Sequence, residues 1–201
     1  GLKNYNTFNS MAGDLSEKIK KRPHNQIFVF DDVISEELCE KFIQIIDTKA
    51  VDETITTPLT NVKCKSLCLN AKEEPKLYQK MVEIRTSLSD VMSGFGVYTL
   101  SDCGYVLRKI HGPTRLHVDS MLDFPGLPYF PRNQVRNLTM TIALNGDYDG
   151  GEFCFPCQNF KIKLKRGQII AFPPFWTHPH YTNELHNDTY RYTINTWLHG
   201  N

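Results

Sequence analysis

The sequence has little that would direct it to a membrane or to nucleic acid. Its 23 basic and 22 acidic residues give a net charge of +1 over 201 residues, which offers no electrostatic attraction for polyanions. No apolar run approaches the roughly 20 residues of a membrane helix, and the first 25 residues lack the apolar segment of a signal peptide. We therefore expect no nucleic-acid partner, no membrane association and a cytoplasmic location.

A disulfide framework is also missing, although the chain has six cysteines. A chain of this length has no need of one, and free, mostly buried thiols favour a reducing compartment. Zinc is an alternative, because Cys64-x3-Cys68 and Cys154-x2-Cys157 could supply four thiolates. Only the spacing supports the first pair, and Cys154 lies in a segment that alternates like a strand. The six cysteines are residues 39, 64, 68, 103, 154 and 157.

Size and composition favour one domain with a sizeable core, at 40% hydrophobic and 22% charged residues. Residues 1–25 are polar, with a short helix expected over 14–21, and we treat them as a flexible arm before a single domain over 26–201. At its start, residues 27–34 alternate like a strand. Ser35 then has the character of an N-cap for a helix reaching residue 47.

A second long helix is expected over residues 73–92, after an irregular, threonine-rich stretch at 48–70. Its apolar residues recur at spacings of three and four, which is typical of one helix face. From 96 to 199 about eight short alternating segments are separated by turn residues, and this pattern indicates a sandwich or barrel, with a jelly roll as a natural candidate. The helical stripe consists of Leu77, Met81, Ile84, Leu88 and Met92.

One short motif carries metal chemistry. His117 and Asp119 lie two apart on an expected strand, so both side chains would share a face. With a distant histidine they would form the 2-His-1-carboxylate triad that leaves positions open on iron(II). A solvated His and Asp on an edge strand is the alternative. Candidates for the distant histidine are His178, His180 and His186.

The last strand places Arg191 on the same face as Trp197. Burying an arginine there is costly unless it meets an anion, and a guanidinium binds a carboxylate in a bidentate manner. A dicarboxylate inside the sandwich would satisfy Arg191. The alternative is an arginine that extends to the edge of the sheet.

Residues 28–199 resemble the prolyl 4-hydroxylase branch of the Fe(II)/2-oxoglutarate-dependent dioxygenases. The similarity rests on "FVFDDVISEELCEKFIQI", on "HVD", on "LKRGQIIAF" and on "RYTINTWLH". It also rests on "RNLTMTIALNGDYDGGEFCFP", which matches an R-x-x-T, L-N, G-G-E, F-P pattern through Arg136, Thr139, Leu144, Asn145, Gly150, Gly151, Glu152, Phe155 and Pro156.

The resemblance implies a mostly β chain with N-terminal helices. Its core would be a double-stranded β-helix, a jelly roll over 96–199, braced by two or three helices within 35–93. It implies iron(II) bound by His117, Asp119 and one C-terminal histidine. The basic residue of relatives lies ten or eleven positions after that histidine, which favours His180 over His178, while His186 lies in a turn. Arg191 would bind the far carboxylate of 2-oxoglutarate.

The implied enzyme is a dioxygenase that uses dioxygen and 2-oxoglutarate to hydroxylate a C–H bond and releases succinate and carbon dioxide. Ascorbate is a candidate reductant, and the implied partner is a peptide or protein containing proline. The same chemistry on a free amino acid, another protein residue or a small metabolite is an alternative. A non-catalytic jelly-roll binding module is another, and the oligomeric state stays open.

This chain departs from the family pattern where relatives place tyrosines near 2-oxoglutarate. Those positions hold Lys109 and Ala143 here, so we expect Tyr105 and Thr141 to contact the cosubstrate instead. Trp197 is a candidate substrate contact. So is Tyr129, in a Pro- and aromatic-rich insertion at 120–135 that is either a substrate lid or a packed surface loop. Residues 54–66 are either a segment that grips substrate or a linker.

Overall fold

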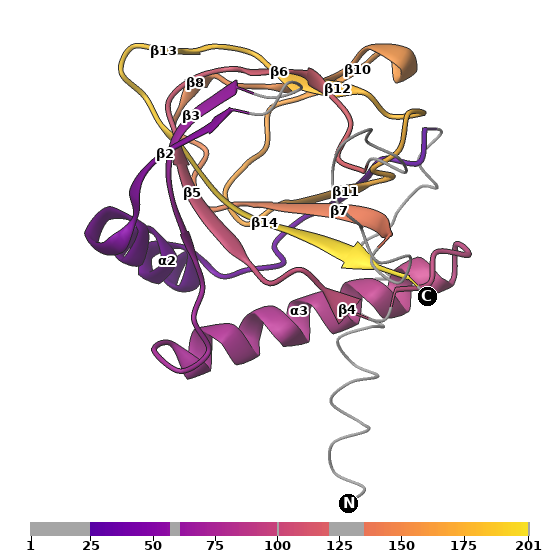
Figure 1. Ribbon diagram of the computed structural model, residues 1–201, viewed down its shortest axis with the longest axis horizontal. Helices are drawn as coiled ribbons and strands as arrows, with labels where there is room; N and C mark the ends of the chain where they lie inside the picture. The colour runs from indigo at the N-terminus through magenta and orange to yellow at the C-terminus, as the bar shows by residue number, and fades with distance from the viewer. Residues whose placement is uncertain (1–24, 57–60, 100, 121–134, 201) are drawn as a thin grey trace, which may run out of the picture.

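The computed structural model describes residues 25–56, 61–99, 101–120 and 135–200 (Figure 1). The helix expected over 14–21 and the candidate contact Tyr129 lie outside these residues. The described elements are β1 (Phe28–Phe30), α2 (Glu36–Lys49), β2 (Val51–Thr56), β3 (Asn61–Cys68), α3 (Pro75–Ser93), β4 (Ser101–Asp102), β5 (Val106–Ile110), β6 (Thr114–His117), β7 (Arg136–Ala143), β8 (Asp149–Gly150), β9 (Phe153–Phe155), the 3-10 helix η2 (Pro156–Gln158), β10 (Phe160–Ile162), β11 (Ile169–Phe172), β12 (His180–Thr182), β13 (Leu185–His186) and β14 (Arg191–His199).

Two antiparallel sheets face each other. The larger sheet has the order β1-β11-β7-β14-β5-β3-β2, with β4 added on β14, and the smaller has the order β10-β9-β12-β6. A two-stranded pair, β13 with β8, lies outside both. In Figure 1 the helices α2 and α3 run along one side of the larger sheet and the smaller sheet lies on the other. This arrangement confirms the jelly roll braced by helices that the sequence predicts.

Both helices form where the pattern predicts them. The backbone N–H of Leu38 donates to the Ser35 hydroxyl at 3.3 Å, so Ser35 is the N-cap of α2. The α3 helix ends at Ser93, and four of the five residues of its apolar stripe are fully buried. The helices therefore contribute one apolar face each to the core.

The register of the larger sheet assigns each residue to one of its two faces, because paired residues share a face. On β14, Ile194 pairs with Leu107 on one side and Ile142 on the other, and all three are buried in the core against the helices. The alternate residues face the smaller sheet. This inner face carries Arg191, Thr193, Asn195 and Trp197 of β14, Arg108 of β5, and Thr139, Thr141 and Ala143 of β7.

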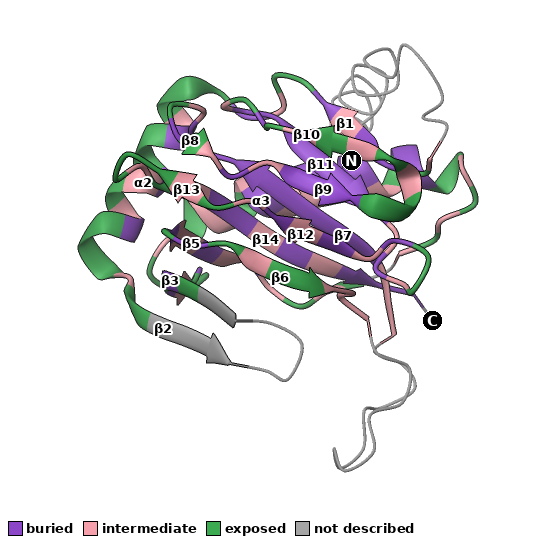
Figure 2. Cartoon of the chain, turned by 90° about the horizontal axis from the view of Figure 1, so that it is seen from above, coloured by how far each residue is buried: buried purple, intermediate pink, exposed green. Residues whose placement is uncertain are grey.

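The space between the sheets is apolar in one half and polar in the other. The apolar half is a cluster that includes Phe153, Phe155, Ile170 and Phe172, from β9 and β11. Figure 2 shows buried residues concentrated in these strands and in β7 and β14. Toward β14 and β5 the inner face becomes polar, and this is where the candidate site lies.

The prediction of irregular structure over 48–70 is wrong. Residues 51–56 and 61–68 form the strands β2 and β3, which pair from Val51 with Ser66 to Thr56 with Asn61. The strand β3 also pairs with β5, so this hairpin extends the larger sheet. The segment is therefore no free linker. The first of the short alternating segments expected after residue 96 is "VYTL" at 97–100, and its described residues 97–99 form no strand.

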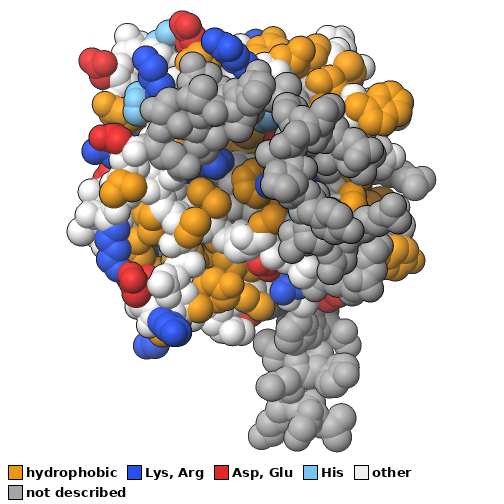
Figure 3. Space-filling view, in the orientation of Figure 1, with side chains coloured by type: hydrophobic (Ala, Val, Ile, Leu, Met, Phe, Trp, Pro, Cys, Tyr) orange, Lys and Arg blue, Asp and Glu red, His pale blue; other side chains and the backbone are white. Residues whose placement is uncertain are grey.

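The described surface shows no dominance of one charge. On the face seen in Figure 3, acidic and basic side chains are interspersed with apolar ones, in keeping with the net charge of +1. Among the described residues, no helix is both long enough and apolar enough to cross a membrane.

Candidate active site

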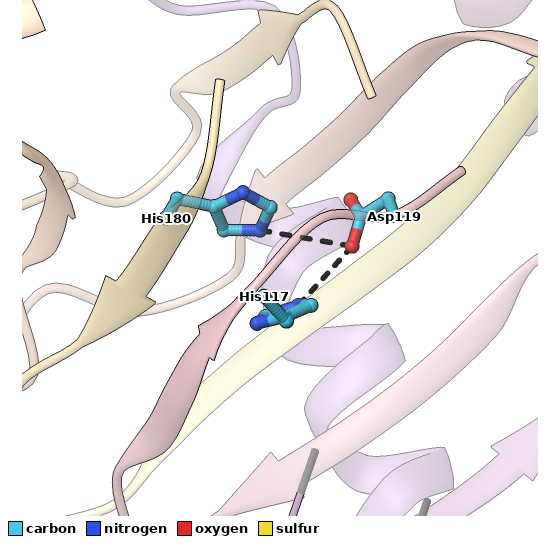
Figure 4. A group of neighbouring side chains, drawn as sticks. All are labelled: His117, Asp119 and His180. Carbon is cyan, nitrogen blue, oxygen red and sulfur yellow. Dashed lines mark ion pairs between the residues drawn. The ribbon is translucent and has the colours of Figure 1, made fainter. Parts of the chain in front are cut away.

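Three side chains converge in the polar half of the interior (Figure 4). His117 is the last residue of β6, Asp119 follows two positions later, and His180 begins β12, which pairs with β6 directly opposite His117. Asp119 Oδ1 lies 3.2 Å from His117 Nε2 and 3.6 Å from His180 Nε2. One ligand atom from each residue falls within 4.8 Å of the others, a spacing that a single metal ion can bridge.

Hydrogen bonds behind the two imidazoles fix which ring nitrogen faces the cluster. His117 Nδ1 lies 2.7 Å from the carbonyl oxygen of Arg115, and His180 Nδ1 lies 3.1 Å from that of His178. A carbonyl only accepts, so each Nδ1 carries a proton and Nε2 is the ring nitrogen left to bind a metal. This tautomer suits metal binding.

Asp119 is held through both its side-chain carboxylate and its backbone. Thr139 donates its hydroxyl to Asp119 Oδ2 at 2.7 Å, and Arg136 donates from Nη1 to the Asp119 carbonyl at 2.6 Å. The Asp119 N–H bonds the carbonyl of Pro174. Thr139 and Arg136 are supporting residues whose contacts with Asp119 the sequence did not reveal.

Burial and neighbouring charge act in opposite directions on these groups. Burial alone would raise the pKa of Asp119, but the hydrogen bond from His117 and the two histidines hold it far below its usual range. For His117, burial lowers the pKa, yet the bond and charge of Asp119 outweigh it and the net shift is upward. Burial lowers the pKa of His180. The cluster thus favours an ionised carboxylate beside imidazoles.

Arg191 lies in the same interior without an anion. Its side chain is 3% exposed, and it donates to the Gly151 carbonyl at 3.3 Å and to Thr182 Oγ1 at 3.5 Å. Its Nε has no acceptor among the described residues. Burial, with Arg108 nearby, lowers the pKa of Arg191 to about 10. Thr182 lies two residues after His180 on β12, so Arg191 and the cluster line one space.

These residues fit iron(II) and a dicarboxylate. Two imidazole nitrogens and one carboxylate are the donor set of non-haem iron(II) oxygenases and leave coordination positions open. The buried Nε–H of Arg191 has no acceptor among the described residues, and a carboxylate could accept from it.

The remaining predicted residues fall in several places. Thr141 lies on the inner face, where its hydroxyl accepts from Asn195 at 2.8 Å. Trp197 is also on that face, and its Nε1 is buried without an acceptor among the described residues. His178 turns away from the cluster, with Nε2 2.7 Å from the carbonyl of Asn25. His186 is exposed on β13.

Tyr105 does not reach the interior site. Its ring packs edge-on against Tyr78 of α3, and its hydroxyl donates to Asp102 at 3.1 Å. Lys109 is on the same helix-facing side, 2.9 Å from Asp47. The residue of β5 that does face the site is Arg108, which the sequence did not single out.

The four cysteines considered for zinc do not come together. Cys64 lies on β3 in the larger sheet and Cys154 lies on β9 in the smaller one. Over residues 25–56, 61–99, 101–120 and 135–200, the one grouping of three or more His, Cys, Asp or Glu side chains able to hold a metal is His117, Asp119 and His180.

Comparison with known proteins agrees with this site. Residues 106–199 match the family model described as the 2OG-Fe(II) oxygenase superfamily. The matching segment contains His117, Asp119 and His180, the three clustered residues. The family implies iron(II), 2-oxoglutarate and dioxygen, and so a dioxygenase. A search of curated protein sequences found no match.

Solved prolyl hydroxylases share the fold. A viral collagen prolyl hydroxylase from Paramecium Bursaria Chlorella virus-1, in a 2-oxoglutarate complex, matches with a TM-score of 0.69 and 16% identity over 89% of this chain and 98% of that one. A prolyl hydroxylase from Trichoplax adhaerens, in complex with a peptide fragment of the hypoxia inducible factor oxygen degradation domain, matches with a TM-score of 0.66 and 11% identity. The match covers 99% of this chain and 93% of that one. A Pseudomonas putida prolyl-4-hydroxylase matches with a TM-score of 0.60 and 12% identity over 95% of this chain and 99% of that one. These similarities show that the chain has the fold of these solved prolyl hydroxylases.

Proposed function

We propose that this chain is an Fe(II)- and 2-oxoglutarate-dependent dioxygenase that hydroxylates proline in a peptide or protein. The observation that carries the proposal is the pairing of the His117–Asp119–His180 cluster with a buried arginine that has no anion. The proline substrate is supported by the fold, because the solved structures that share it include prolyl hydroxylases.

In this proposal His117, Asp119 and His180 hold the iron, and Arg191 binds the far carboxylate of 2-oxoglutarate. When bound, iron(II), 2-oxoglutarate and dioxygen together supply the oxidising power that hydroxylates a C–H bond, with release of succinate and carbon dioxide. Ascorbate is the reductant we would add to the assay.

The chain's own residues orient the metal-binding atoms and exclude water from one side of the site. Thr139 and the carbonyls behind the imidazoles hold the donor atoms in place. The rings of Phe155 and Phe172 pack against His180 at centroid distances of 5.5 and 4.7 Å, and so exclude water from that side. Thr141 and Trp197 lie on the inner face, where the proposal assigns them contacts with cosubstrate and substrate.

The test is succinate release coupled to detection of hydroxyproline by mass spectrometry, with a library of proline-containing peptides. We expect iron-dependent succinate release that rises with a subset of these peptides. Succinate formation that no proline peptide stimulates would refute the proline substrate and favour the same chemistry on another molecule.

Two histidine variants check the ligand assignment. His180→Ala should abolish turnover and iron retention, because it removes one of three donors. His178→Ala should keep most of both, since His178 bonds the Asn25 carbonyl instead. Metal content after desalting separates loss of iron from loss of chemistry. The opposite pattern, with iron lost only in His178→Ala, would overturn the assignment.

A further inference from the structure

A second arginine points into the same interior from β5. Arg108 pairs with Thr193 of β14 and Ser66 of β3, so it shares the inner face with Arg191 and Trp197. It is close enough to act electrostatically on both His117 and Arg191, which lie on different strands around the site. Arg108 is therefore a cation directed at the space between the sheets.

One nitrogen of the Arg108 guanidinium lacks a hydrogen-bond partner in the described part of the chain. Its Nε is buried and has no hydrogen-bond acceptor there. Among the described residues, the arginines that form ion pairs with carboxylates are Arg85 and Arg166, not Arg108. Leaving such a donor buried and unsatisfied is costly, so a ligand acceptor is the natural complement.

Trp197 lies next to Arg108 on the inner face of the larger sheet. Its ring centroid lies 6.0 Å from Cζ of Arg108 and 4.2 Å from Cζ of Arg136. Its Nε1–H is also buried without an acceptor. Trp197 pairs with Thr139, the residue that holds Asp119. Two unsatisfied donors thus lie together beside the metal cluster.

The charge balance points the same way. Arg108, Arg136 and Arg191 lie around an interior in which, among the described residues, Asp119 is the carboxylate of the cluster, and Asp102 is already paired with Arg85. Three guanidinium groups against one carboxylate leave a surplus of two positive charges. Iron(II) and 2-oxoglutarate bring equal and opposite charges, so the surplus remains when both are bound.

We infer that Arg108, together with the Trp197 N–H, binds a carboxylate carried by the primary substrate, close to the carbon that is hydroxylated. This inference rests on the proposed function, which places the substrate in this interior. The carboxylate belongs either to an acidic residue flanking the target proline or to a free amino acid. Arg108 is in this reading a residue that determines specificity and does not bind the cosubstrate.

The test measures binding by calorimetry under argon, with the iron- and 2-oxoglutarate-loaded protein. The probes are capped Asp-Pro-Ala and Ala-Pro-Asp peptides, their asparagine counterparts, and free L-proline against L-prolinamide. We expect the carboxylate form to bind about tenfold or more tightly in at least one pair, because hydrogen bonds to charged partners are the strong ones.

Arg108→Gln should remove that preference and Arg108→Lys should keep part of it, with 2-oxoglutarate affinity unchanged in both. Lys65→Gln is the matched control. It removes one positive charge next to Ser66, the β3 partner of Arg108, but from an exposed position on the other face of the sheet. It should leave the preference intact. Melting curves confirm that each variant is folded.

Three results would contradict the inference. They are the absence of any carboxylate preference in all three probe pairs, a preference that survives Arg108→Gln, and an Arg108→Gln variant whose main defect is weak 2-oxoglutarate binding. In a separate assay with dioxygen, the absence of succinate release with every probe would count against the proposed function, and the binding comparison would still decide the role of Arg108.

Discussion

At the scale of single residues, each proposed metal ligand is tied to the protein by a second atom. The two imidazoles use Nδ1 to donate to the carbonyls of Arg115 and His178, and Asp119 uses Oδ2 to accept from Thr139. The donor atoms are therefore oriented before a metal arrives. Such outer contacts typically contribute about 10- to 100-fold to metal affinity.

Thr139→Val tests that orientation. The substitution keeps the shape and removes the hydroxyl that bonds Asp119 at 2.7 Å, so we expect iron affinity to fall roughly tenfold or more. Thr139→Ser is the control, because it retains the hydroxyl. Iron titration followed by calorimetry gives the two affinities. An unchanged affinity in the valine variant would show that Thr139 does not position the carboxylate.

At the scale of elements, the sequence predicts the helices and strands whose apolar residues recur regularly on one face. The helices α2 and α3 and most strands of the core could be placed this way. The hairpin β2–β3 could not, because its strands lie toward the end of the larger sheet, and its threonine- and lysine-rich pattern gives little alternation of apolar residues.

The sequence also did not show which face of β5 points toward the site. Leu107 and Ile110 are both buried although they lie on opposite faces of the strand, so apolar alternation does not tell which side is the interior. Tyr105 was therefore expected at the site and Arg108 was overlooked. The motif residues His117 and Asp119 were found because their spacing is local, whereas the support from Thr139 depends on a contact between distant segments.

The cap of α2 offers a prediction for an element. Ser35→Ala removes the acceptor for the Leu38 N–H, and this should cost about 1 kcal/mol of stability. Ser35→Asp should retain most of it, since aspartate is also a good N-cap. Urea unfolding at equilibrium measures both. An alanine variant as stable as the wild type would mean that the cap contributes nothing.

At the scale of the whole molecule, the two sides of the larger sheet have different roles. The helix side buries an extended apolar cluster that includes Phe42, Met81 and Ile142, while the other side carries unsatisfied cationic groups. Most of the stability must come from the first, and binding iron and cosubstrate should add to it by mass action.

Iron(II) and 2-oxoglutarate should together raise the melting temperature. At a hundredfold excess over Kd a ligand stabilises by about 2.7 kcal/mol, which for a chain of this size is roughly 5–10 °C. In Arg191→Gln the increment from iron should persist and that from 2-oxoglutarate should be lost. Thermal melts under argon measure both increments. A full 2-oxoglutarate increment in this variant would mean that Arg191 is not its anchor.

The strand β14 contributes side chains both to the core against the helices and to the site. Ile194, Thr196 and Leu198 are fully buried, Ile194 and Leu198 in the core against the helices, and the residues between them face the site. Side chains at the intervening positions point away from that core, so we expect substitutions there to disturb it less than substitutions at Ile194 or Leu198. A lineage can therefore exchange one substrate for another along this strand while the scaffold stays folded, and a protein engineer has the same freedom. Arg108 on the neighbouring strand is the first position at which we would look for such divergence.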